Sequence, residues 1–254
     1  MTRVGLVMPA LDEEQALPLV LAELPRSRRP IVVVVDNGST DRTAEVARAG
    51  GAHVVHEPRR GYGQACLAGL WWLLSGEGLA PPLADGDLVV FLDADHSDYP
   101  EDLESLLAPL LADEADFVLG SRVLGGASLK ALLPQAWFGN RLACFLMRLL
   151  FGARYTDLGP FRALRVGALR RLEMGDTGFG WTIEMQLKAR SRALRVREVP
   201  VRYRARVGKS KITGTLSGTL RAGAKILGWI AAWRLRTWLA PGRVAVSSRD
   251  RRSP

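Results

Sequence analysis

Short runs of β-branched and aliphatic residues alternate with stretches of helical spacing through the first half of the chain, and this alternation constrains the fold most. The apolar runs, each followed by polar turn residues, occupy residues 4–8, 31–35, 52–56, 88–92 and 117–120. Helical spacing fills the intervals between them. Buried apolar runs joined by helices are typical of parallel strands. The predicted fold class is therefore α/β, a mostly parallel sheet with helices on both faces and ligands outside the carboxyl ends of its strands.

The second half of the chain is less regular, with an apolar helix predicted at residues 140–150 and a strand near residues 196–203. A length of 254 residues is compatible with one large α/β domain, and we see no repeat or linker that would divide it. We therefore expect a single domain over residues 1–240 and a disordered basic tail over residues 241–254.

The formal net charge of +9 indicates a negatively charged partner, whether phosphate, nucleic acid or anionic lipid. Residues 188–225 contain twelve Lys or Arg residues and one acidic residue, so the positive charge is concentrated late in the chain. This segment lacks the interleaved aromatic residues of a platform that stacks nucleic-acid bases. Nucleic acid is therefore not the expected partner.

The sequence shows neither an export signal nor a membrane-spanning helix. The N-terminal apolar stretch is short and soon acidic, unlike a signal peptide. A spanning helix needs about 20 mostly apolar residues. The best candidate is interrupted by four cations, Arg221, Lys225, Arg234 and Arg236. The two cysteines, Cys66 and Cys144, lie in apolar surroundings and are expected to be free buried thiols, which suits a reducing cytosol.

Acidic residues follow two of the predicted strands. Asp93 and Asp95 come directly after the fourth apolar run, where alternation puts both carboxylates on one side and allows them to hold a cation against a diphosphate. An isolated pair of this kind is more often a solvated turn or a helix cap. Asp36 follows the second run and could accept hydrogen bonds from a base or ribose, while Ser39 or Thr40 caps the next helix.

A glycine pair follows the third run. Gly61 and Gly63 begin a partial G-x-G-x-x-G pattern, but Cys66 stands at its last position and the pattern does not follow the first strand. It is therefore a poor dinucleotide-binding fingerprint. We expect these glycines to let a helix start approach a ligand or the neighbouring backbone closely.

Taken together, these segments resemble glycosyltransferase family 2, a group with the GT-A fold that includes the polyprenol-phosphate sugar transferases. The resemblance covers roughly residues 3–230. It rests on five segments in the family's order and at about its spacing, residues 7–14, 35–41, 61–63, 93–95 and 120–122. No single segment is specific, but the set of five is.

The resemblance implies a Rossmann-like half over residues 1–125 that binds a nucleotide sugar, and an acceptor side over residues 126–214. The implied nucleotide-sugar site consists of Pro9, Ala10, Glu13, Asp36, Gly63 and Asp93. Asp93 and Asp95 would bind Mg²⁺ or Mn²⁺. The polyprenol-phosphate mannosyltransferases often have glutamine where this chain has Ser97, which implies a looser metal dependence.

Three later segments are similar to the family's acceptor-side motifs. Arg162 follows an acidic turn in which Pro160 departs from the usual pattern, and its side chain could meet a phosphate bidentately. Glu184 would be a polar group of the acceptor pocket. A basic loop would clamp phosphates with Arg206, Lys209 and Lys211. The predicted catalytic residues are Asp95, Arg122, Arg162 and Glu184.

The expected reaction transfers a hexose from a UDP- or GDP-sugar, with inversion, to a polyprenyl phosphate or another cell-envelope acceptor. A phosphate monoester is already an anion and needs no strong base, whereas a hydroxyl acceptor would need one, for which Glu184 is the first candidate. Two alternatives remain open. One is a sugar-phosphate nucleotidyltransferase, and the other is a non-catalytic basic module that binds nucleotides or membranes.

Residues 215–240 are predicted to form an amphipathic helix on the membrane surface. At about 100° per residue, Arg221, Lys225 and Arg236 fall in one wedge opposite an apolar sector. The helix would place its cations against anionic headgroups and its tryptophans at the interface. A helix packed on the protein's own core is the alternative, which Arg234 inside the apolar sector favours. We expect a cytoplasmic protein held peripherally at the inner face of the plasma membrane.

Overall fold

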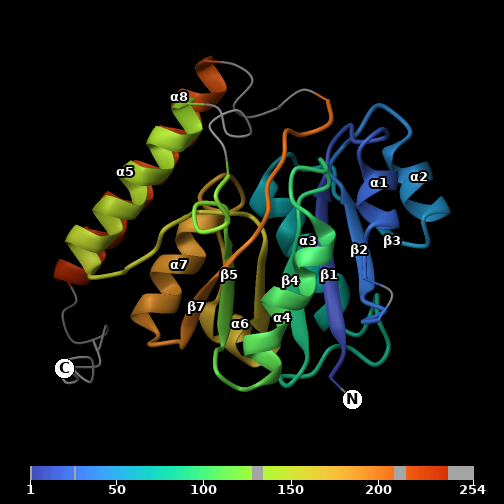
Figure 1. Ribbon diagram of the computed structural model, residues 1–254, viewed down its shortest axis with the longest axis horizontal. Helices are drawn as coiled ribbons and strands as arrows, with labels where there is room; N and C mark the ends of the chain where they lie inside the picture. The colour runs from blue at the N-terminus through green and yellow to red at the C-terminus, as the bar shows by residue number, and fades with distance from the viewer. Residues whose placement is uncertain (1, 26, 128–133, 209–215, 240–254) are drawn as a thin grey trace.

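The computed structural model describes residues 2–25, 27–127, 134–208 and 216–239 of the chain. In these residues seven strands form one sheet in the order β3-β2-β1-β4-β6-β5-β7 (Figure 1). The strands are β1 (Val4–Ala10), β2 (Ile31–Asp36), β3 (His53–His56), β4 (Leu88–Phe91), β5 (Phe117–Ser121), β6 (Arg162–Arg165) and β7 (Val196–Pro200). β6 runs antiparallel to both of its neighbours, and the other pairs are parallel. The predicted mostly parallel sheet is confirmed.

Helices cover both faces of the sheet, because alternate residues of each strand point to opposite sides and both sets are apolar. One face carries α1 (Leu17–Ala22), α2 (Thr43–Ala49), the 3-10 helix η1 (Pro100–Asp102) and α4 (Leu103–Leu111). The other carries α3 (Tyr62–Leu74), α6 (Val166–Leu172) and α7 (Trp181–Ser191). Along β4, Leu88 and Val90 pack in the first layer, and Val89 and Phe91 pack in the second.

Two long helices, α5 (Pro134–Phe151) and α8 (Leu216–Leu239), lie side by side at the opposite end of the molecule from α1 and α2 (Figure 1). They share a third apolar core with α7, in which Met147, Ile183 and Ile230 are buried. None of the described helices is both long enough and apolar enough to span a membrane.

Six of the strands lie where the apolar runs predict them, but β6, α6 and α7 are not predicted. β6 follows the predicted polar turn and carries Arg162 and Arg165, so no apolar run marks it. The strand forms because Arg162 finds backbone partners inside the protein and because both neighbouring strands pair with it.

Cys66 and Cys144 are free and buried, as the sequence predicts. The basic tail over residues 241–254 lies outside the described residues. The division of the chain into donor and acceptor halves stays a prediction.

The sheet register places the functional segments. Ala10 at the end of β1 pairs with Asp36 at the end of β2, and Val7 pairs with Phe91 at the end of β4. The residues that follow Phe91 therefore emerge at the same edge as those that follow β1 and β2.

Candidate active site

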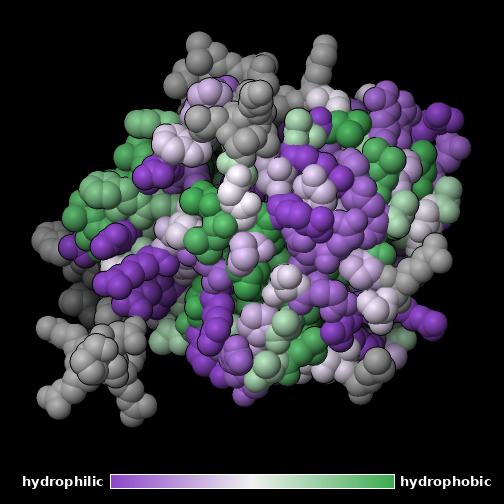
Figure 2. All heavy atoms as spheres, in the orientation of Figure 1, coloured by the Kyte–Doolittle hydropathy of each residue, from purple (hydrophilic) through white to green (hydrophobic). Residues whose placement is uncertain are grey.

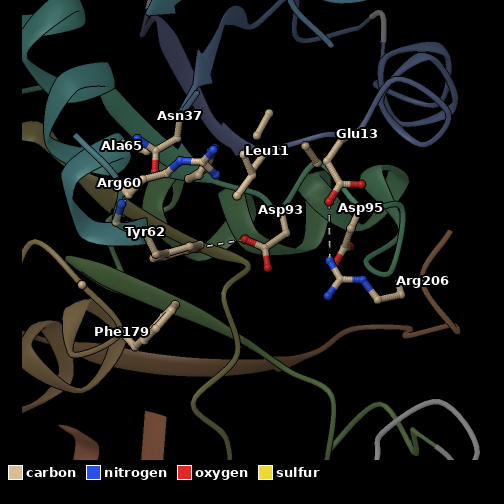
Figure 3. A pocket seen from close by; sticks show the side chains of 15 residues that line it. Leu11, Glu13, Asn37, Arg60, Tyr62, Ala65, Asp93, Asp95, Phe179 and Arg206 are labelled. Carbon is tan, nitrogen blue, oxygen red and sulfur yellow. Dashed lines mark hydrogen bonds and ion pairs between the residues drawn. The ribbon is translucent and has the colours of Figure 1, made fainter. Parts of the chain in front are cut away.

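A cavity of about 440 Å³ opens at this edge of the sheet (Figure 3). Its walls come from the ends of β1, β2 and β4, the start of α3, the turn before α7 and the segment that follows β7. The lining residues are Pro9, Ala10, Leu11, Glu13, Asn37, Arg60, Gly61, Tyr62, Ala65, Asp93, Ala94, Asp95, Gly178, Phe179 and Arg206. An apolar cavity of this size with a few convergent polar groups is typical of a small-molecule site.

Three acidic residues, Glu13, Asp93 and Asp95, line the cavity, and the two aspartates form an acidic pair at the end of β4. Asp93 accepts a hydrogen bond from the Tyr62 hydroxyl at 2.9 Å, and Asp95 accepts two from Ser97, from its backbone N–H at 2.9 Å and from its hydroxyl at 2.6 Å. Desolvation and the negative charge of Asp95 raise the pKa of the Asp93 carboxyl. Asp95 thus lies close enough to Asp93 to disfavour the ionised form of that carboxyl.

Arg206 brings positive charge to the same place. Its guanidinium forms an ion pair with Asp95, and its Nη2 lies 3.7 Å from Oε1 of Glu13 (Figure 3). The neighbouring Val207 N–H donates to the backbone carbonyl of Asp95 at 3.0 Å. Arg206, which is predicted to bind phosphate, therefore lies against Asp95, which is predicted to bind the metal ion. Lys209 and Lys211, the other predicted phosphate-binding residues, lie outside the described residues.

The acidic pair fits a divalent cation shared with a bound diphosphate. Within the described ranges, no three His, Cys, Asp or Glu side chains converge as a metal cage. Mg²⁺ commonly takes only one or two protein carboxylates and completes its shell with water and substrate phosphates. Burial first, and then the neighbouring Asp95 carboxylate, raise the pKa of Asp93, and a cation beside it would favour its ionised form. Asp93 and Asp95 are suited to this role without further protein ligands.

Asp36 lies behind the cavity wall and does not line it. Its carboxylate accepts from the Ser39 N–H at 2.8 Å and pairs with Nδ1 of His56 at 3.1 Å. The next residue, Asn37, lines the cavity in its place. Asn37 donates to two backbone carbonyls and accepts from the Gly61 N–H, each at 2.8 Å, so it joins the end of β2 to the loop before α3.

The predicted glycine pair allows close backbone packing. A Cβ at Gly63 would lie 2.0 Å from the carbonyl oxygen of Asp176, and one at Gly61 would lie 2.2 Å from that of Thr177. Real contacts of this kind do not occur, so both positions need glycine. Gly63 does not line the cavity. Its role is to let α3 begin against the turn that carries Phe179 into the cavity.

Glu184, the candidate base, is 1% exposed and is not among the residues that line the cavity. Its carboxylate accepts hydrogen bonds from the N–H groups of Gly175 and Asp176 and pairs with Lys188 at 2.8 Å. The predicted role of Glu184 on the acceptor side stays a prediction, and the described structure buries its carboxylate against backbone groups. The sequence gives no sign of this, because the backbone groups that it binds belong to an irregular turn.

Arg162, the candidate phosphate ligand, is fully buried. Its guanidinium donates to the backbone carbonyls of Leu158, Gly159 and Thr182. Burial lowers the pKa of Arg162 to about 10. The predicted phosphate contact of Arg162 stays a prediction, and the described structure commits its donors to backbone carbonyls instead.

Arg122 also lies outside the cavity lining. It makes a bidentate ion pair with Asp157, with distances of 2.7 and 2.8 Å, and its guanidinium lies 5.0 Å from the centre of the Tyr203 ring. Asp157 is fully buried, so this pair joins β5 to the turn before β6. Of the predicted site residues, six line the cavity: Pro9, Ala10, Glu13, Asp93, Asp95 and Arg206.

Comparison with known proteins identifies the family. Residues 6–172 match the family model described as glycosyl transferase family 2, which covers more than half of the chain. The chain belongs to this family. Membership makes the protein a glycosyltransferase and sets aside both the nucleotidyltransferase and the non-catalytic module.

Several relatives of this family 2 transferase have informative names. An uncharacterised glycosyltransferase of Mycobacterium tuberculosis is 38% identical over 86% of this chain and 94% of its own. The dolichyl-phosphate hexose transferase of Haloferax volcanii is 36% identical over 82% of this chain and 86% of its own. The undecaprenyl-phosphate mannosyltransferase of Micrococcus luteus is 30% identical over 91% of this chain and 96% of its own. The predicted resemblance to polyprenol-phosphate sugar transferases is confirmed.

Solved structures confirm the GT-A-like fold of this family 2 transferase. Glucosyl-3-phosphoglycerate synthase from Mycobacterium tuberculosis, in complex with Mn²⁺, UDP and phosphoglyceric acid, superposes with a TM-score of 0.69 at 22% identity. The match covers 92% of this chain and 78% of that one. Another structure of that synthase contains Mg²⁺ and UDP.

Sequence reasoning assigned no role to several residues that line the cavity of this family 2 transferase. Asn37 and Tyr62 belong to segments 35–41 and 61–63, on which the family resemblance rests. Their position beside Asp36 and Gly61 could therefore have indicated that they line the site. Arg60 directly precedes the glycine pair, and Phe179 begins the segment with Glu184 that resembles the family's acceptor side, but neither was predicted to line the donor cavity. Phe179 reaches the cavity only because its turn packs on the start of α3.

Proposed function

We propose that the protein transfers a hexose from a UDP- or GDP-sugar, with inversion, to a polyprenyl phosphate. The observation that carries the proposal is the meeting of Asp93, Asp95 and Arg206 in one cavity at the carboxyl ends of the strands. Acidic and basic groups side by side suit a diphosphate with its cation. The names of two relatives, which act with dolichyl phosphate and undecaprenyl phosphate, support the acceptor class.

On the donor side, Pro9, Ala10 and Asn37 would hold the nucleoside, which leaves the diphosphate near Asp93 and Asp95. These two carboxylates would hold Mg²⁺ or Mn²⁺, which supplies a Lewis acid for the leaving nucleoside diphosphate. Asp36 would act indirectly, by keeping the end of β2 and its following turn in place.

On the acceptor side, the structure favours a phosphate over a hydroxyl. A hydroxyl acceptor needs a general base, and the candidate Glu184 is committed to backbone N–H groups and Lys188. An ionised phosphate monoester needs only to be positioned for attack on the anomeric carbon. The predicted phosphate-binding residues Lys209 and Lys211, which lie outside the described residues, would supply the countercharge.

A lipid-linked acceptor requires approach to a membrane, and the surface of α5 supports this. Phe138, Phe145 and Leu149 are 65%, 59% and 66% exposed on its outward face. Figure 2 shows hydrophobic residues gathered over α5 with hydrophilic ones beside them. Arg141 and Arg148 are exposed on the same helix and would meet anionic headgroups.

The predicted role of α8 in membrane contact stays a proposal. Leu227 and Leu235 are 42% and 55% exposed, while Ile230 is buried in the core shared with α5. The side chains of Arg221, Lys225 and Arg236 lie outside the described residues. We therefore assign the main contact to α5, with α8 beside it.

Product analysis tests the reaction. Purified protein is incubated with each UDP- or GDP-hexose, Mg²⁺ or Mn²⁺, and undecaprenyl phosphate. The expected products are a free nucleoside diphosphate and a glycosylated lipid phosphate of inverted anomeric configuration. Transfer only to hydroxyl acceptors would overturn the proposed acceptor, and a retained configuration would overturn inversion.

Vesicle sedimentation tests the membrane surface. Wild-type protein should pellet with anionic vesicles, and the double substitution Phe145→Ser with Leu149→Ser should pellet much less. Trp71→Ser is the matched control, because Trp71 is 53% exposed on α3 and should not affect binding. If the double substitution instead leaves vesicle binding intact and changes the oligomeric state, the α5 surface is an interface between two copies.

A further inference from the structure

The segment that follows β7 is attached along the loop that carries the acidic pair. The Arg204 N–H donates to the Ser97 carbonyl at 2.9 Å, and the Val207 N–H donates to the Asp95 carbonyl at 3.0 Å. Next to the first of these bonds, Tyr203 forms an antiparallel bridge with Asp98. Residues 201–207 therefore have a defined position beside residues 95–99.

Side chains fix this segment on the side away from the cavity. The ring of Tyr99 lies between two guanidinium groups, with its centre 4.4 Å from that of Arg202 and 4.2 Å from that of Arg204. Arg202 also pairs with Asp102 at 2.7 Å, and Arg204 pairs with Glu23. None of these groups lines the cavity, so the segment is held whether or not the cavity contains a ligand.

Arg206 is the member of this arginine series that enters the cavity. Its guanidinium lies on the Asp95 carboxylate, and Glu13 is a more distant second acid at 3.7 Å. Its Nε is buried and has no hydrogen-bond partner among the described residues. The side chain therefore neutralises Asp95 but leaves part of its own donor capacity unused.

We propose that Arg206 is an internal counter-ion that competes with the divalent cation for Asp95 and moves to the donor's diphosphate when the cation binds. The proposal rests on the proposed function, because it assigns Asp95 to the cation. In this exchange, each member of the Arg206–Asp95 ion pair takes a new partner. Asp95 passes from the guanidinium to the metal, and the guanidinium passes from the carboxylate to the phosphates.

This exchange predicts a specific binding order. A cation that binds alone must displace Arg206 from Asp95 and leave it with only the more distant carboxylate of Glu13, at 3.7 Å. A diphosphate that arrives with the cation offers the guanidinium new acceptors, including one for the unused Nε, and Arg–phosphate pairs are strong. Cation and nucleoside diphosphate should therefore strengthen each other's binding, and this coupling is reciprocal.

The cation and the diphosphate can strengthen each other's binding through Arg206 or through direct contact with each other. Substitution of Arg206 removes only the first of these contributions. Arg206→Ala and Arg206→Gln should bind Mn²⁺ alone more tightly than wild type, by about tenfold, which lies within the usual range of coupling between sites. Added UDP or GDP should then improve their Mn²⁺ affinity by a smaller factor than in wild type. Glutamine preserves more of the side-chain volume, so it serves as the second variant if alanine loosens the segment.

The measurement is the electron paramagnetic resonance signal of unbound Mn²⁺ during titration, with and without nucleoside diphosphate. Arg202→Ala is the matched control, because it removes an arginine from the same segment outside the cavity. It should leave the Mn²⁺ affinity at the wild-type value. An equal gain in Arg202→Ala would show that loosening the segment is sufficient and would overturn the role of Arg206.

Unchanged or weaker binding of Mn²⁺ alone in both Arg206 variants would also overturn the proposal. The outcome is independent of catalysis, because no sugar is transferred in the titration. If wild type transfers hexose while the Arg206 variants show no gain, only this inference fails. If Mn²⁺ titration supports the exchange while no sugar is transferred, only the proposed reaction fails.

Discussion

Two regions of the molecule use acidic and basic residues in opposite ways. One is the edge of the sheet that lines the cavity, and the other is the wall behind it, formed by residues 156–184. At the edge, Asp93, Asp95 and Arg206 face a cavity and keep capacity for a ligand. In the wall, Arg162 and Glu184 are buried and bonded to backbone groups. An acidic or basic residue in a recognised motif is therefore a ligand-binding candidate only where its partners leave room for a ligand.

The comparison also explains why the wall is built from charged groups. Residues 156–184 cross the sheet as an antiparallel strand and then turn before α7, so many of their backbone groups lack regular partners. Buried carbonyl and N–H groups are costly to leave unpaired. Arg162 satisfies carbonyls and Glu184 satisfies N–H groups, which stabilises an irregular but well-defined surface behind the donor site.

Asp95→Asn gives the largest expected effect on function. It removes the charge but keeps an acceptor for Ser97, which Asp95→Ala would not do. Turnover should fall by about 10³-fold, because metal-based charge stabilisation contributes several kcal/mol. Steady-state kinetics and thermal melting measure this together. Wild-type activity with an unchanged metal response would place the cation elsewhere.

Arg162→Met should act on stability. It leaves buried carbonyls of Leu158, Gly159 and Thr182 without donors, at a cost of about 3 kcal/mol. For a chain of this size the melting temperature should fall by about 6–12 °C. Arg162→Lys should not restore it, because one ammonium cannot reproduce the planar donor set. A stable variant that has lost only phosphate binding would return Arg162 to the active site.

Glu184→Gln should reduce stability by about 1–2 kcal/mol, because it weakens the bonds to Gly175 and Asp176 and removes the charge opposite Lys188. Turnover per folded molecule should be unchanged. Loss of a general base would instead lower turnover by about 10²–10⁴-fold. Denaturant unfolding and kinetics on the same preparation distinguish the two, and a large kinetic loss would contradict the structural role.

Asp98 gives the smallest and most specific effect. It is 1% exposed, and neither carboxylate oxygen has a hydrogen-bond partner in the described part of the chain. Burial, with the charge of Asp93 nearby, raises the pKa of Asp98 well above its ordinary value of 3.8. The folded state therefore keeps a proton that the unfolded state loses, and stability falls as pH rises above about 4.

Asp98→Asn has no such proton to lose. Its stability relative to wild type should increase between pH 4 and pH 8, by more than about 1 kcal/mol, since one pKa unit corresponds to about 1.4 kcal/mol. Thermal melting in the presence of a chelator, at several pH values, measures this difference. A constant difference across the whole range would show that the carboxyl does not titrate in this way.

The sequence predicted the donor edge better than the wall. Asp93 and Asp95 follow a run of apolar strand residues, so their position depends on local alternation and on the shared direction of parallel strands. Asp36 was placed at the correct strand end, but its carboxylate binds the Ser39 N–H three residues on and His56 of β3, and it does not line the cavity. The local sequence pattern predicts which edge of the sheet a residue occupies. Contacts with neighbouring groups decide whether its side chain lines the cavity.

The sequence by itself determined the alternation of strands and helices in the first half of the chain, the two-sided apolar sheet and the edge where acidic residues gather, because these follow from short-range periodicity. The tertiary structure alone decided that β6 enters antiparallel between β4 and β5, that Arg162 and Glu184 belong to the wall, and that Arg206 lies on Asp95. The physical reason is that the free energy of a charged side chain depends on burial and on its partners. In this protein those partners come from segments far apart in the chain.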